Sequence, residues 1–79
     1  MVTLNFYAAA RAATGIAEDQ FSPASLGEII SAATVKYPQL AAILPGCSYL
    51  INGSASSQLE KEIASGDVVD VLPRFAGGA

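Results

Sequence analysis

The chain has 79 residues, of which 52% are hydrophobic and 14% charged, and its formal net charge is −3. This length allows one domain with a single core. The few cations form no basic patch, which argues against a nucleic-acid partner, and no apolar stretch is long enough for a membrane span. The single cysteine, Cys47, excludes an internal disulfide, and histidine is absent, which excludes a Cys/His zinc site. The start of the chain does not resemble a signal peptide, so we expect a cytoplasmic protein.

The first elements predict a hairpin. Residues 2–7 alternate apolar and polar side chains, which is typical of a half-buried strand. The alanine-rich residues 8–16 form a connection with room for a helical turn. Glu18–Phe21 is expected as a second strand, close enough in sequence to pair with the first.

A capping box marks the main helix. Ser25 occupies the N-cap position, and Glu28 follows three residues later. The residues that then fall on one helical face are Leu26, Ile29, Ile30, Ala33 and Tyr37. Pro38 ends the helix, because the residue before a proline avoids the α region. Residues 39–44 are expected as a short second helix.

The last part of the chain predicts further strands. Residues 48–52 form a strand whose inward face is either Tyr49 and Ile51 or Leu50. After the Asn-Gly turn, residues 54–57 are a loop or a short strand, and residues 59–63 are expected as a short helical turn. Residues 68–72 form the final strand, in which Asp70 marks the solvent face, so that Val69 and Val71 face the helix.

This order of elements predicts an α+β fold. A hairpin, a helix laid across a mixed sheet and a last strand beside the first make a ubiquitin-like β-grasp roll with one main helix. We expect residues 1–73 to form this domain and residues 74–79 to form a flexible C-terminal Gly-Gly tail.

Few side chains offer catalytic chemistry. Without histidine there is no His-based triad, and Cys47 is interpreted as a small buried hydrophobe, because no cation or helix start lies nearby to activate a thiol. Arg11 is either a surface charge or a partner contact. Four acids precede the tail, namely Glu60, Glu62, Asp67 and Asp70, and they lead us to expect a basic surface on any partner that receives this end.

The C-terminal stretch LPRFAGGA favours insertion into a partner. Phe75 can bind in a pocket and Arg74 can pair with an acid there. Beyond them, Ala76, Gly77 and Gly78 carry almost no side chain, so this thread can bring a terminal carboxylate into a narrow active site, where adenylation activates it. The alternative is an ordinary frayed terminus.

Several segments together resemble the small, sulfur-carrier subunit of molybdopterin synthase, of the MoaD/ThiS-like ubiquitin-like family. They are FYAAARAATG near the start, KYPQL at the end of the helix, INGS after the third strand, and SGDVVDVLPRFAGG. The resemblance covers nearly the whole chain in order and spacing.

The resemblance implies a non-catalytic carrier subunit that binds no cofactor. A ubiquitin-activating-like adenylyltransferase uses ATP to adenylate the final glycine, here Gly78, which then becomes a thiocarboxylate, with Gly77 as the slender residue before it. The resemblance also implies that the tail enters the large catalytic subunit of the synthase, and that Arg74, Phe75 and Ala76 belong to the inserted segment. There its sulfur passes to cyclic pyranopterin monophosphate during molybdenum cofactor biosynthesis. The assembled synthase of this family is a heterotetramer.

One residue departs from this pattern. The family ends on Gly-Gly, whereas this chain continues to Ala79. We expect removal of Ala79 before activation, rather than tolerance by the partner or an inactive carrier. Three other functions stay open: a carrier for thiamine or cysteine synthesis, a ubiquitin-like protein modifier, and a binding module with an inert tail.

Overall fold

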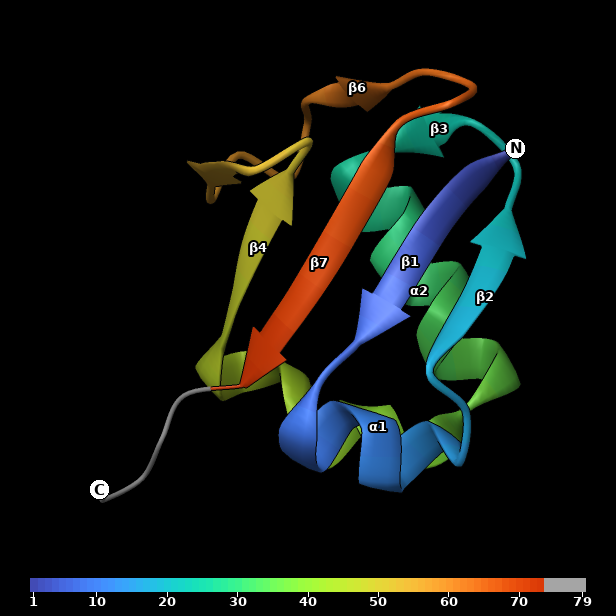
Figure 1. The fold of residues 1–79 in the computed structure, drawn as a ribbon, viewed down its shortest axis with the longest axis vertical. Helices are drawn as coiled ribbons and strands as arrows, with labels where there is room; N and C mark the ends of the chain where they lie inside the picture. The colour runs from blue at the N-terminus through green and yellow to red at the C-terminus, as the bar shows by residue number, and fades with distance from the viewer. Residues whose placement is uncertain (74–79) are drawn as a thin grey trace.

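Five strands form one mixed sheet in the computed structural model, which describes residues 1–73 (Figure 1). In spatial order they are β2 (Glu18–Phe21), β1 (Val2–Phe6), β7 (Val68–Pro73), β4 (Cys47–Ile51) and β5 (Ser54–Ser56). Strand β7 lies in the centre, parallel to β1 and antiparallel to β4. The prediction that the last strand lies beside the first is confirmed, and so is the first hairpin, because β1 and β2 pair antiparallel.

Helix α2 (Leu26–Lys36) packs across one face of this sheet. Its capping box is present: the Ser25 side chain accepts from the Glu28 backbone N–H at 3.1 Å, and the Glu28 carboxylate accepts from the Ser25 N–H at 3.0 Å. The helix ends before Pro38, as the sequence predicts. The predicted second helix is present as two short 3₁₀ segments, η1 (Pro38–Ala42) and η2 (Leu44–Gly46).

The alanine-rich connection forms α1 (Ala8–Thr14), which is longer than the single turn that the sequence predicts. Gly15 stops this helix with a left-handed φ of 79°, and its N–H donates to the Arg11 carbonyl at 2.8 Å. Figure 1 shows α1 at the end of the sheet where β1 and β7 finish.

The turn between β4 and β5 explains why residues 54–56 form a strand. Asn52 and Gly53 have φ values of 50° and 86°, as a two-residue hairpin turn requires. The register then pairs Ile51 with Ser54 and Leu50 with Ala55. Ile51 is buried, and Tyr49 packs against the core, so these two residues form the inward face.

The predicted helical turn over residues 59–63 is wrong. Glu62–Ile63 forms strand β6, which pairs with β3 (Ala24–Ser25) in a small second sheet. This segment does not form a helix because its carbonyls serve as hydrogen-bond acceptors for the start of α2. The first N–H groups of α2 have no partner within the helix. The N–H groups of Leu26 and Gly27 donate to the carbonyls of Lys61 and Leu59, each at 2.8 Å.

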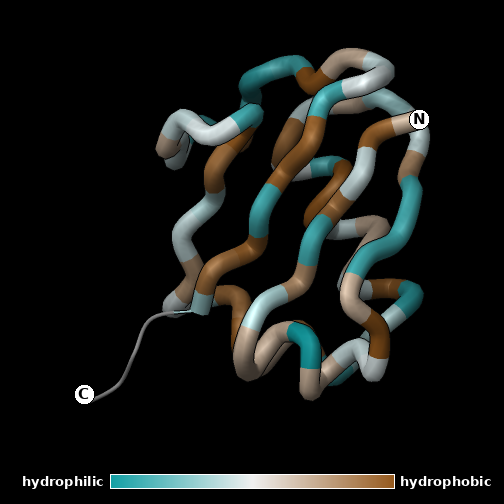
Figure 2. The backbone as a smooth tube through the Cα atoms, in the orientation of Figure 1, coloured by the Kyte–Doolittle hydropathy of each residue, from teal (hydrophilic) through white to brown (hydrophobic). Residues whose placement is uncertain are grey.

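The core lies between the sheet and α2. Its buried side chains are Val2, Leu4, Phe6, Ala10, Phe21, Leu26, Ile29, Ala33, Leu40, Ile51, Ile63, Val69 and Val71. The predicted inward positions Val69 and Val71 are therefore confirmed. Hydrophobic segments run along the central strands in Figure 2, and one hydrophilic segment interrupts β7.

Candidate functional site: the end of β7 and the outer face of the sheet

The described chain ends at Pro73, the last residue of the central strand β7. Pro73 lies opposite Cys47 of β4, at the end of the sheet that carries α1. The predicted site residues Arg74, Phe75, Ala76, Gly77 and Gly78 lie outside the residues that the structure describes. What the structure does describe is the surface from which they continue.

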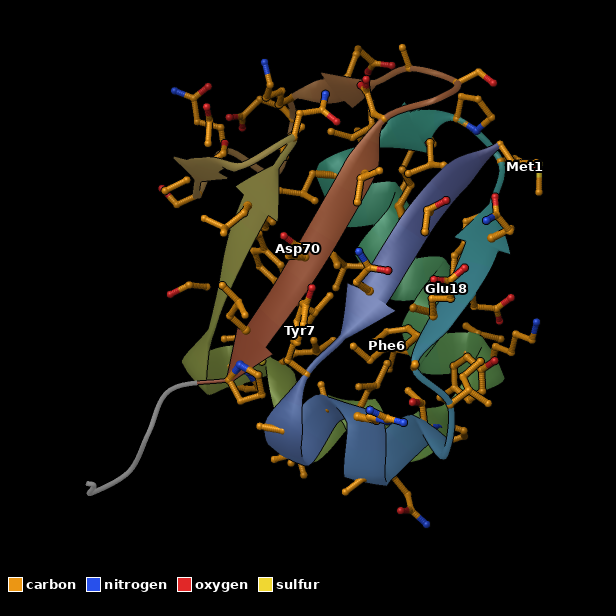
Figure 3. The ribbon with its side chains drawn as sticks, in the orientation of Figure 1. Met1, Phe6, Tyr7, Glu18 and Asp70 are labelled. Carbon is orange, nitrogen blue, oxygen red and sulfur yellow. The ribbon has the colours of Figure 1, made fainter. Side chains whose placement is uncertain are left out.

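The face of the sheet that points away from α2 leads directly to Pro73. We call its central part the outer patch, and its residues are Asn5, Tyr7, Leu50, Val68, Asp70 and Leu72. The register places Asp70 between Asn5 on one side and Leu50 on the other. Val68, Leu50 and Leu72 are each half-buried, although no layer covers this face within residues 1–73. Figure 3 looks onto this face, with Tyr7 labelled just below Asp70.

The carboxylate of Asp70 is the charged group at the middle of this patch. Its Oδ1 accepts a hydrogen bond from the Asn5 side-chain amide at 3.0 Å. Within residues 1–73 no cation pairs with it, because the one ion pair found there joins Lys36 to Asp19 on the α2 side. The outer patch therefore combines apolar area with a single negative charge.

Arg11, the remaining predicted site residue, is exposed on α1. It lines a shallow hollow of about 230 Å³ together with Asn5, Tyr7 and Glu18. Because Asn5 and Tyr7 also belong to the outer patch, the fold places Arg11 at the border of this patch. The interpretation of Arg11 as a partner contact thus has a geometric basis that the sequence lacked.

Three of the four acids that precede the tail lie elsewhere. Asp67 comes just before β7, and six strand residues span about 20 Å, so Asp67 lies at the far end of the sheet from Pro73. Glu62 belongs to β6, and Glu60 lies in the adjoining turn, also near that far end. Of these four acids, only Asp70 contributes charge to the outer patch. The other three are close to the tail in sequence, but they lie at the opposite end of the sheet.

Cys47 is half-buried, and its side chain packs against the core. Its Sγ donates to the Ile43 carbonyl at 3.3 Å, and burial raises the pKa of the thiol. A thiol with a raised pKa is mostly protonated at neutral pH and is a poor nucleophile. The structural role that the sequence favours for Cys47 agrees with this environment.

A second polar cluster, which the sequence did not reveal, joins the edge strand β2 to the end of α2. The Lys36 ammonium lies 2.7 Å from Asp19 Oδ2, and the Tyr37 hydroxyl donates to the same oxygen at 2.5 Å. These two partners lower the pKa of Asp19, with Lys36 as the larger cause. The contacts lie within the helix-covered side of the sheet, so we assign the cluster to stability rather than to the site.

The sequence profile of the ThiS family matches residues 4–78. The chain belongs to the ThiS family. This assignment confirms the family resemblance and the ubiquitin-like α+β fold, and it makes the chain a carrier or modifier of the ThiS type. No curated protein matches this ThiS-family chain. None of its helices within residues 1–73 is long and apolar enough to cross a membrane.

Solved structures support the fold of this ThiS-family chain. Small archaeal modifier protein 1 from Methanosarcina acetivorans matches with a TM-score of 0.87 and 24% identity, over 98% of this chain and 95% of that one. The BexX/CysO complex of Amycolatopsis orientalis contains a chain with a TM-score of 0.83 and 25% identity, over 99% and 100%. The complex of subunits 1 and 2 of the molybdopterin-converting factor from Helicobacter pylori contains one with a TM-score of 0.72 and 21% identity, over 98% and 97%.

Proposed function

We propose that this chain is the sulfur-carrier subunit of a molybdopterin synthase. The observation that carries the proposal is the position of the Gly77-Gly78 pair, which follows the end of the central strand β7 after Arg74, Phe75 and Ala76, where that strand ends beside the outer patch. The ThiS-family match also stops at residue 78, one residue before Ala79. A carboxy end with small side chains, placed after a folded domain, suits delivery of a terminal thiocarboxylate into the active site of a partner.

The chemistry begins with activation of the Gly78 carboxylate after Ala79 is removed. A carboxylate oxygen attacks the α-phosphorus of ATP in the activating adenylyltransferase, and pyrophosphate leaves. A sulfur nucleophile at the sulfide oxidation level then attacks the acyl carbon, and AMP leaves, which yields the thiocarboxylate. In the large subunit the thiocarboxylate sulfur forms a bond to a carbon of cyclic pyranopterin monophosphate, which gives a thioester between carrier and pterin. Water then cleaves the acyl C–S bond, so that the sulfur stays on the pterin and the chain returns with a carboxylate.

In this proposal the chain itself positions the reactive carboxy end inside the partner. Gly77 and Gly78 leave room in a narrow channel, because they carry no side chain. Arg74, Phe75 and Ala76 line the inserted segment, and Arg11 contacts the partner from α1. The chain has no active site of its own in this proposal, so ATP binds to the activating enzyme and no cofactor binds to the carrier.

Intact mass spectrometry tests the proposal. The chain 1–78 and the chain 1–79 are each incubated with ATP and a ubiquitin-activating-like adenylyltransferase. We expect the chain 1–78 to gain one adenylyl group, and then one sulfur in place of one oxygen when a sulfur donor is added. The absence of any gain on both chains would refute the carrier function, and a thiocarboxylate on Ala79 would refute the trimming.

A second candidate keeps the carrier chemistry and changes the sulfur acceptor. The 25% identity to a chain of the BexX/CysO complex favours considering it, because the molybdopterin-converting factor chain is 21% identical. Affinity capture on the thiocarboxylated chain separates the two. Recovery of the large synthase subunit supports molybdopterin synthesis, whereas recovery of a thiazole synthase alone supports the alternative acceptor. Lysine-linked conjugates on a denaturing gel would indicate a protein modifier instead.

A further inference from the structure

Asp70 occupies a position where a sheet does not favour aspartate. It lies in the middle of the central strand β7, between Asn5 of β1 and Leu50 of β4. Asp is depleted in strands, and a residue that breaks a local preference without stabilising the fold often marks a functional surface. The carboxylate has about four acceptor positions, and within residues 1–73 only Asn5 donates to it.

The direct neighbours of Asp70 on this face are uncharged. Along β7 its same-face neighbours are Val68 and Leu72, both half-buried, and Leu50 lies across the pair with β4. A partner that covered these apolar side chains would also remove water from the carboxylate. Desolvation of an unpaired charge is costly, so a partner that binds here must supply a cation or several donors.

The chain's own described cations do not supply that charge. Lys36 pairs with Asp19 at the α2 side, and Lys61 lies in the loop beside the start of α2. Arg11 lies at the border of the outer patch, but it forms no ion pair with Asp70. A second copy of the chain is also a poor occupant, because a twofold contact through this patch would bring two Asp70 carboxylates towards each other.

We propose that the outer patch binds a partner protein whose surface presents one arginine to Asp70, ringed by apolar side chains that cover Leu50 and Leu72. The planar guanidinium suits this site, because it donates in parallel to a carboxylate and tolerates an apolar surround better than an ammonium does. The patch is continuous with Pro73 through Leu72, so any protein that receives residues 74–79 lies against it. The inference rests on the proposed carrier function and identifies the chemistry of that function's partner.

The test measures affinity for the adenylyltransferase and for the large synthase subunit by titration calorimetry, with the full chain at low and high salt. We expect Asp70→Asn to weaken binding to at least one of them by about tenfold or more and to reduce the salt dependence. Glu62→Gln is the matched control, because it removes the same charge from an exposed position at the far end of the sheet, and it should bind like the wild type.

A second pair of variants tests the apolar ring. Leu50→Gln should weaken the same complex, and Leu59→Gln, at a site 52% exposed beside α2, should not. A charge swap provides a further check: a partner variant with glutamate in place of its arginine should bind the Asp70→Arg variant of this chain.

Equal affinity of Asp70→Asn and the wild type at both salt concentrations would overturn the proposal and leave the carrier function intact. If the chain binds a partner but neither the 1–78 nor the 1–79 form accepts an adenylyl group, the carrier function fails and the docking surface stands. If it binds neither partner, both fail.

Discussion

The backbone N–H of Gly27 donates to the carbonyl oxygen of Leu59 at 2.8 Å, and Leu59 fills the space that a side chain at Gly27 would need. A Cβ at position 27 would lie 3.2 Å from both the Leu59 Cβ and its carbonyl oxygen. The loop before β6 can therefore approach closely enough to accept hydrogen bonds from the first turn of α2 only because residue 27 has no side chain.

We expect Gly27→Ala to destabilise the domain by about 1 kcal/mol, although alanine is the better helix former by a similar amount. The crowded atom is the same carbonyl that accepts the hydrogen bond, so the loop cannot move away without weakening it. Urea unfolding measures the change, with Ser31→Ala on the exposed side of α2 as the control that should be neutral or stabilising. A Gly27→Ala variant more stable than the wild type would contradict this account of the loop.

Asp19 should make the free energy of unfolding depend on pH in the acid range. Lys36 and Tyr37 lower the pKa of Asp19 in the folded state, so its contribution is complete above the ordinary pKa of about 3.9 and is lost as pH falls through the lowered value. We expect Asp19→Asn to cost about 1 kcal/mol or less at pH 7 and to flatten the acid limb of a plot of unfolding free energy against pH. Glu18→Gln, on the neighbouring exposed residue, should leave that limb as it is. An unchanged acid limb in Asp19→Asn would show that the cluster contributes nothing.

Cys47 should be dispensable for sulfur transfer. Burial raises the pKa of its thiol, and its hydrogen bond to Ile43 holds it against η2. We expect slow alkylation by iodoacetamide at pH 7.5, relative to free glutathione, and rapid alkylation in urea. Cys47→Ala should lose about 1 kcal/mol of stability and keep full sulfur transfer. Fast labelling of the folded protein, or loss of transfer in this variant, would assign the thiol a chemical role.

Deletion of residues 77–79 should separate folding from function. Among residues 1–73, every buried core residue lies between Val2 and Val71, so we expect an unchanged unfolding midpoint. The same deletion should abolish acceptance of the adenylyl group, and Gly77→Leu should reduce sulfur transfer by tenfold or more, because a side chain at position 77 blocks a narrow channel. The matched control is Val35→Leu, at an exposed position on α2. Full transfer by Gly77→Leu would remove the steric argument for the glycine pair.

Local patterns were sufficient to predict the main elements. The capping box of Ser25 and Glu28 located α2, and period-two alternation located β1 and β7 with the correct inward residues. These signals depend on neighbours within four residues, which is why they can be recognised from sequence alone.

Features that depend on distant segments could not be predicted in this way. Leu59 and Ile63 stand four residues apart, as in a helix. Residues 59–60 instead form a turn and Glu62–Ile63 a strand, because the start of α2 needs the carbonyls of this segment as acceptors. The outer patch likewise exists only because β1, β7 and β4 are adjacent, which brings Asn5 within 3.0 Å of Asp70 across 65 positions of sequence. Such contacts follow from topology rather than from a local motif.

The central place of β7 has a consequence for the order in which the molecule can assemble. The β1–β2 and β4–β5 hairpins do not pair with each other, and β7 is the strand that joins them. The β4–β5 hairpin meets β7 across a short stretch of chain, from Ile51 to Val69, but β1 meets β7 only across most of the sequence, from Thr3 to Val68. The complete sheet therefore needs one long loop closure, so we expect acquisition of the native state to be slow for its size and close to all-or-none. A polypeptide truncated before β7 should behave as an unfolded chain, and the strand that leads to the reactive end is also the last part needed to complete the protein.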